Sequence, residues 1–177
     1  FMEQGFVNYL SVLLIVDAQT AERSVEAMMK RAEVNVVAYK KLVNVAEKYL
    51  FEPNSPMVSD EMYIMFLNQV MKTSVLSKVE KARFEYQYRV VMKNRVGSVA
   101  TDFLYIDKEG KSGTLHKFEA EETLLIFYDP DCDNCTEIIE KLRYNRELNA
   151  KIMSGKMKVL AIYAEDNLEL WKRELAK

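Results

Sequence analysis

"TLLIFYDPDCDNC", residues 123–135, decides the fold of the second half of the chain. It opens with a short apolar run of the kind that a buried parallel strand requires. A proline, three aspartates and a Cys-x-x-Cys pair follow directly. This order predicts a strand that ends just before the first cysteine and a helix that begins there.

The residues after this motif predict a complete strand–helix–strand unit. Residues 132–154 carry apolar side chains at helical spacing and stop at Gly155, which predicts one continuous helix. "KVLAIYA", residues 158–164, predicts a second buried strand, and residues 165–177 predict a last helix. Two parallel strands joined through a helix form a βαβ unit with a right-handed crossover. Upstream of it, "ATDFLYID" and "TLHKF" predict two strands joined through a glycine-containing loop.

The first 95 residues predict helices instead. The longest is expected over residues 21–50, where apolar side chains recur every three or four positions and form one stripe. The stripe consists of Val25, Met28, Ala32, Val36, Tyr39, Val43, Ala46 and Leu50. Residues 10–16 are the most apolar run, and they are far shorter than the ~20 residues that a membrane span needs. A core helix is therefore expected there.

Pro53 and Pro56 interrupt the helical pattern, and Ser59 is a candidate N-cap for the helix that follows. A further helix is expected over residues 79–96, with Gly97 as its end. The methionine, tyrosine and phenylalanine side chains of these helices are expected to pack in a core. A ligand groove or partner surface is the alternative for them.

Composition places the chain among ordinary globular proteins, with 177 residues, 49% hydrophobic and 29% charged, and a net charge of −2. No basic stripe runs along it, so nucleic acid is not an expected partner. The change of pattern near residue 95 predicts two domains. A helical domain is expected over residues 1–95 and an α/β domain over residues 96–177.

The two cysteines suit thiol–disulfide chemistry. Cys132 falls where the strand ends and the helix begins, so the helix dipole and the free N–H groups of the first turn favour its thiolate. Cys135 lies one turn further and is placed to resolve a mixed disulfide. Three carboxylates surround the pair and oppose the thiolate, which favours a reductant over a strong oxidant. The residues expected to modulate the pair are Asp129, Pro130, Asp131 and Asp133.

The cysteine pair has three alternative interpretations. A zinc site needs about four ligands, and the only other thiol or imidazole is His116, in the hairpin region. Peroxide chemistry of the peroxiredoxin kind would require Thr or Ser where Asp129 stands. A structural staple or two merely adjacent thiols remain open, although so short a loop constrains the unfolded chain little. No metal and no cofactor besides the redox-active disulfide is expected.

From Gly97 onward the chain resembles the thioredoxin-like domains of the bacterial envelope branch that includes TlpA and ResA. The matching segments, in order, are "GSVATDF", "DKEGKSGTL", "TLLIFYDPDCDNC" and "KMKVLAIYAED". The segments "AEKYLFEPNSPM" and "KARFEYQYRVVMKNRVG" resemble a helical domain of unknown function that precedes such domains in envelope lipoproteins. The resemblance implies an oxidoreductase of protein thiols and disulfides on the periplasmic side, lipid-anchored in the full-length protein. It also implies a helical domain that binds a partner or forms a homo-oligomer.

Two departures from this family matter. Asp131 stands where the family has tryptophan before the first cysteine, and none of the three prolines, Pro53, Pro56 and Pro130, follows the cysteines. The family's cis-proline and closing elements would lie past Lys177, so we expect a truncated thioredoxin-like domain that acts poorly on protein substrates. The rival hypothesis is a non-catalytic interaction or scaffold module with a vestigial thioredoxin-like fold.

Overall fold

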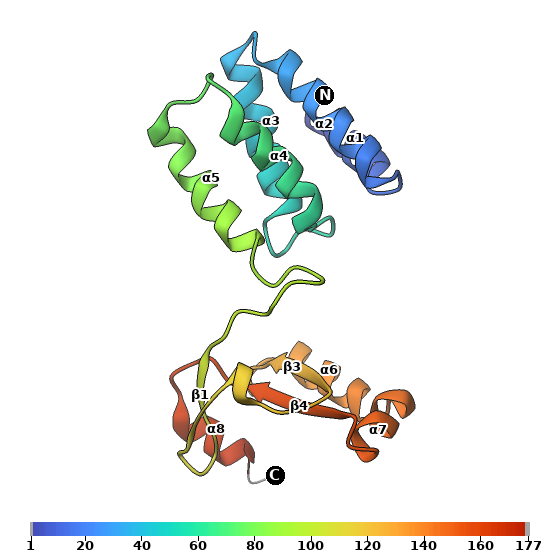
Figure 1. Cartoon of the computed structure of the whole chain (residues 1–177), viewed down its shortest axis with the longest axis vertical. Helices are drawn as coiled ribbons and strands as arrows, with labels where there is room; N and C mark the ends of the chain where they lie inside the picture. The colour runs from blue at the N-terminus through green and yellow to red at the C-terminus, as the bar shows by residue number, and fades with distance from the viewer. Residues whose placement is uncertain (1, 176–177) are drawn as a thin grey trace. The chain divides into compact units, whose positions relative to one another are not determined.

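The computed structural model describes residues 2–175. Its contacts divide the chain into two compact units, and the division falls between Thr101 and Asp102 (Figure 1). The first unit is helical, and the second combines strands and helices.

The helical unit is built from α1 (Met2–Leu13), α2 (Ala18–Ala32), α3 (Val36–Leu50), α4 (Asp60–Lys72) and α5 (Lys78–Val91). Helix α4 packs against α2, α3 and α5, and α1 packs against α3 (Figure 1). No helix in the described part of the chain is both long and apolar enough to cross a membrane.

The hydrophobic core of this unit is centred on α4. Tyr63, Phe66 and Leu67 have no exposed surface, and Phe6 of α1 meets Phe66 edge-on with 5.7 Å between ring centroids. The expectation that the aromatic and methionine side chains pack inside is confirmed for the α4 residues. It is wrong for Tyr86 on α5, which is 61% exposed.

The single helix expected over residues 21–50 is two helices. Helix α2 ends at Ala32, and Asn35 then caps α3 by accepting a hydrogen bond from Ala38 N–H on its side-chain oxygen at 3.0 Å. The apolar stripe continues across this break, so its periodicity does not reveal the interruption. Asparagine is a preferred N-cap, and it is the local signal for the new start.

The other helix ends agree with the sequence prediction in one case and depart from it in two. Ser59 caps α4 as predicted, with its hydroxyl accepting from Met62 N–H at 3.3 Å. Helix α5 ends at Val91, well before Gly97, because the chain turns at Asn94, whose φ is +54°. The apolar run over residues 10–16 is only partly core: α1 ends at Leu13, and the residues after it are exposed.

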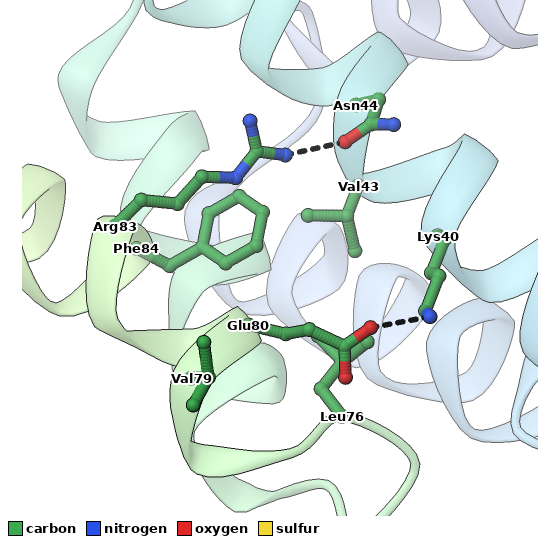
Figure 2. A pocket seen from close by; sticks show the side chains of 8 residues that line it. All are labelled: Lys40, Val43, Asn44, Leu76, Val79, Glu80, Arg83 and Phe84. Carbon is green, nitrogen blue, oxygen red and sulfur yellow. Dashed lines mark hydrogen bonds and ion pairs between the residues drawn. The ribbon is translucent and has the colours of Figure 1, made fainter.

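Helices α3 and α5 are clasped across a groove of about 230 Å³ (Figure 2). At one end Lys40 of α3 pairs with Glu80 of α5, and at the other Arg83 donates to the side-chain oxygen of Asn44 at 2.6 Å. Apolar side chains, including that of Phe84, line the space between these two contacts. The two contacts, Lys40–Glu80 and Arg83–Asn44, link α5 to α3.

The second unit contains a hairpin and a parallel pair. Strands β1 (Leu104–Ile106) and β2 (Ser112–Thr114) are antiparallel and are followed by the short 3-10 helix η1 (Leu115–Lys117). Strands β3 (Glu122–Phe127) and β4 (Met157–Ile162) are parallel, with Phe127 opposite Ile162. The predicted parallel pair is confirmed. A hairpin is present as predicted, but its second strand ends at Thr114, and the segment expected to form that strand is mostly the 3-10 helix η1.

The helix expected over residues 132–154 is also two helices, α6 (Asp133–Arg143) and α7 (Arg146–Met153). Asn145 separates them because its side chain accepts a hydrogen bond from Leu148 N–H at 3.0 Å and starts α7. The last helix, α8, spans Leu168–Leu175, and the final two residues of the predicted 165–177 segment lie outside the described part of the chain.

The two parallel strands are less buried than their apolar sequences predict. The side chains of β3 are half-buried or exposed, and Phe127 is 61% exposed. Full burial of a parallel strand requires both faces to be covered, and within residues 102–175 β3 and β4 form a two-stranded sheet that no further strand joins. Most of the buried apolar residues therefore lie in the helical unit, and among the described residues of the second unit Leu170, at 7% exposure, is the one buried apolar residue.

Candidate functional site

The Cys-x-x-Cys pair lies at the carboxyl end of the parallel strands. Tyr128 N–H donates to the Ile162 carbonyl at 3.0 Å, which extends the pairing by one residue before the chain leaves the sheet. Cys132 then immediately precedes α6, and Cys135 lies in the first turn of that helix. Both side chains are half-buried, and both are free thiols.

A tight turn delivers Cys132 to the start of the helix. The carbonyl of Asp129 accepts the Cys132 N–H at 3.1 Å, and the Asp129 carboxylate accepts the Asp131 N–H at 3.0 Å. Pro130 lies between them, and aspartate followed by proline is a favoured opening for a β-turn. The residues Asp129, Pro130 and Asp131 thus form a single turn. Asp133 is the first residue of α6, and its side chain is exposed.

Cys132 is the N-cap of α6. Its sulfur accepts the Cys135 N–H at 3.3 Å, in the position where an N-cap hydroxyl or carboxylate usually accepts. Its carbonyl accepts the Thr136 N–H at 3.1 Å, the first hydrogen bond of the helix. The sulfur therefore faces the free N–H groups of the helix end, which stabilise negative charge.

The two thiols differ in acidity because of this contact. Hydrogen bonds from the Cys135 side chain and backbone lower the pKa of the Cys132 thiol, since they stabilise its thiolate. The same side-chain hydrogen bond raises the pKa of Cys135, because the Cys135 thiol is the donor and must keep its proton to form it. The arrangement therefore has one sulfur suited to attack and one that stays protonated beside it.

The acidic residues around the pair are not equivalent. Asp129 is half-buried, and its negative charge makes a small contribution that raises the pKa of both thiols, against the hydrogen bonds that lower that of Cys132. A hydrogen bond from the Asp129 backbone acts in the opposite direction on Cys135 and lowers its pKa by more than the charge raises it. Asp131 and Asp133 point into solvent, where charge effects are screened. Of the three carboxylates that the sequence groups together, only that of Asp129 is half-buried.

Tyr163 belongs to this site and was missed in the sequence. It follows β4 directly, and its ring lies 6.4 Å from that of Tyr128, which follows β3. Burial is the main cause that raises the pKa of Tyr163, a hydrogen bond from the Asn167 backbone opposes it, and the charge of Asp129 adds a smaller rise. The usable signal was the parallel pairing itself, because residues after adjacent parallel strands meet at one edge of the sheet.

His116 lies in η1, where its backbone N–H donates to the Asp102 carboxylate at 2.9 Å. Within residues 2–175, no three Cys, His, Asp or Glu side chains come together in a way that could hold a metal ion.

Solved structures match this chain to different extents. A thioredoxin-like protein from Bacteroides caccae is 33% identical and matches 99% of this chain with a TM-score of 0.92, and this chain spans 63% of the length of that protein. The C-terminal domain of an uncharacterized protein from Bacteroides fragilis is 40% identical over 47% of this chain and 59% of its own, with a TM-score of 0.45. A conserved protein of unknown function from Bacteroides fragilis is 32% identical over 45% of this chain and 58% of its own, with a TM-score of 0.43.

The match over nearly the whole chain shows the predicted fold class, a helical N-terminal region followed by a small thioredoxin-like α/β region. No curated protein matches the chain significantly. The family model described as a domain of unknown function, DUF5106, matches residues 1–94, which is more than half of the 177 residues. The chain therefore belongs to the DUF5106 family.

Proposed function

We propose that this chain is a thiol–disulfide oxidoreductase that acts on protein thiols and disulfides, with Cys132 as nucleophile and Cys135 as resolving cysteine. The observation that carries the proposal is the N-cap position of Cys132, whose sulfur accepts the Cys135 N–H at 3.3 Å. The thioredoxin-like fold of the neighbour from Bacteroides caccae supports the same class of chemistry.

The reaction uses only the two sulfurs and a protein disulfide. The Cys132 thiolate attacks one sulfur of the substrate disulfide, and the other substrate sulfur leaves as a thiolate that takes up a proton. Cys135 then loses its proton and attacks the Cys132 sulfur, which releases the second substrate thiol. Two electrons pass to the substrate, and a disulfide between Cys132 and Cys135 remains. An external thiol reductant restores the dithiol.

The direction and setting are part of the proposal. A half-buried carboxylate, Asp129, opposes the thiolate of the pair, which favours reduction of substrates over their oxidation. The resemblance to the TlpA and ResA branch favours the periplasmic side of a bacterial envelope and a lipid anchor in the full-length protein. We propose no metal and no cofactor besides the disulfide. The helical region is proposed to bind a partner or a second copy.

Serine variants of the two cysteines test the assignment. Cys132→Ser should abolish exchange with a small aromatic disulfide, whereas Cys135→Ser should keep the attacking thiol and accumulate mixed disulfides. Non-reducing electrophoresis and mass spectrometry measure both. Trapped partners on Cys132→Ser instead would reverse the roles.

The same assay tests the rival scaffold hypothesis. A working pair should react with the small disulfide much faster than free cysteine does at the same pH, because part of it is already thiolate. A wild-type rate no greater than that of free cysteine would leave the chain as an interaction module with a vestigial pair.

A further inference from the structure

A second cavity of the helical unit is formed by residues of α2, α3 and α4. It has a volume of about 180 Å³. Pockets that take drug-sized ligands measure roughly 300–1,000 Å³, so this one suits a smaller molecule. The side chains that matter for its chemistry are Glu26, Met29, Lys30, Glu33, Tyr39 and Lys72.

Tyr39 brings a buried hydroxyl to this lining. The side chain has 0% exposed surface, and among the described residues its hydroxyl has no hydrogen-bond partner. Burial raises the pKa of Tyr39 to about 12, against a smaller opposing effect of the Thr73 hydroxyl, so the phenol keeps its proton at neutral pH. The Thr73 hydroxyl is itself engaged, because it donates to the Glu33 carboxylate at 2.6 Å and accepts the Val75 N–H at 3.2 Å. A buried hydroxyl without a partner is destabilising, and a bound acceptor would remove that cost.

The charged lining of the cavity is mixed and balanced. Glu26 and Glu33 supply two carboxylates, and Lys30 and Lys72 supply two ammonium groups. Within residues 2–175, neither lysine forms an ion pair. The two carboxylates would repel a simple anion, and the two ammonium groups would repel a simple cation. A small molecule that carries one charge of each sign can use both pairs.

We propose that this cavity binds a free α-amino acid with an aliphatic side chain. The carboxylate of the ligand accepts from the Tyr39 hydroxyl and lies toward Lys30 and Lys72, which makes charge-assisted hydrogen bonds. Its ammonium group lies toward the carboxylates of Glu26 and Glu33. The buried Met29 provides an apolar wall for the side chain. This inference does not depend on the exchange chemistry of the cysteines.

Titration calorimetry with the full chain tests the class of ligand. The probes are L-alanine, L-valine and L-leucine, each taken to about 10 mM, which covers the weak affinity expected of so small a ligand. We expect saturable binding of at least one. The amine that lacks the carboxylate and the acid that lacks the ammonium group should each bind at least about tenfold more weakly, because each leaves one pair of charges in the cavity without its partner.

Variants test the site. Tyr39→Phe removes only the hydroxyl, so it should weaken binding by about tenfold without lowering the urea unfolding midpoint, since no hydrogen bond of the free chain is lost. The double variant Lys30→Gln/Lys72→Gln should weaken binding at least as much. Lys41→Gln removes an exposed lysine of α3 that does not line the cavity, and it is the matched control with unchanged affinity.

Four results would overturn the proposal. The first is no saturable binding of any of the three amino acids, because the charged lining would then be no more than a solvated surface. The second is wild-type affinity in Tyr39→Phe or in the double lysine variant. The third is equal binding of the acid alone, which would make the cavity an anion site. The last is an equal loss in Lys41→Gln, because the effect would then come from the charge of the whole unit.

Discussion

The hydrogen bond between Tyr63 and Gln87 joins α4 to α5, and its removal tests the description of the helical core. Tyr63 has no exposed surface, and its hydroxyl donates to the Gln87 side-chain oxygen at 2.7 Å. Gln87 is 8% exposed, and its amide nitrogen donates to Glu47 of α3 at 2.5 Å. Tyr63→Phe removes only the hydroxyl, leaves the ring stacked on Phe51 and creates no large cavity.

The cost follows from what remains in the core. The Gln87 oxygen would be buried with no donor, and an unsatisfied buried acceptor costs about 1–3 kcal/mol. With a urea m-value of about 1.5 kcal/mol/M, a loss of about 2 kcal/mol lowers the unfolding midpoint by about 1.3 M. Urea titration followed by far-UV circular dichroism measures this, because α1–α5 contribute most of the described helix.

The control for this prediction is Tyr86→Phe, which removes a hydroxyl from a side chain that is 61% exposed and should leave the midpoint unchanged. The double variant Tyr63→Phe/Gln87→Met should lose less than the sum of its parts, because the Gln87 oxygen that Tyr63→Phe leaves without a donor is then absent. A Tyr63→Phe midpoint equal to that of the control would refute the role given to this hydrogen bond.

Three further predictions concern other contacts. Asn35→Ala should cost about 1 kcal/mol in the same urea titration, because it removes the N-cap of α3. Hydrogen bonds led by that of Lys40 lower the pKa of Glu80 to about 2, so its contribution to stability is complete above pH 4.5 and is lost as the pH falls through about 2. The stability difference between wild type and Glu80→Gln should shrink over that window; a constant difference would contradict it. Gly113→Ala places a Cβ 2.6 Å from the Tyr105 ring, so it should weaken the β1–β2 hairpin, which faster amide exchange in these strands would show. The effect of Gly113→Ala should be smaller in a Tyr105→Leu background, because the ring that the Cβ meets is then absent.

The sequence predicts a helix start well where a preferred N-cap residue stands between a helix-breaking segment and an amphipathic pattern. Ser59 was identified as a cap because prolines precede it and an amphipathic helix follows, and its hydroxyl does cap α4. Asn35 and Asn145 are caps of the same kind, but they lie inside apolar patterns that continue past them, so periodicity alone predicts an unbroken helix at each. Each asparagine starts a new helix, because its side chain satisfies a first-turn N–H while the apolar face stays on the core side.

Burial was less predictable than element type. The apolar run of β3 predicts a fully covered strand, yet Phe127 is 61% exposed and lies 6.1 Å from the ring of Phe103. Apolar composition specifies what a strand can bury, whereas its coverage depends on which elements lie over it. In the helical unit the stripes of several helices meet on α4, so the same kind of reasoning there predicts the core well.

The site shows which inferences require three dimensions. The position of Cys132 at a helix start follows from the order of strand, turn and helix, which a short stretch of sequence displays. Tyr163 reaches the site only because β3 and β4 pair in parallel, with Phe127 opposite Ile162, so that the residues after each strand meet. Three aspartates in alternate positions are equal in sequence, but the turn gives the first one two backbone contacts and leaves the others in solvent. Asp129 differs from its neighbours through its place in that turn, and its chemistry beside the sulfurs is a consequence of that geometry.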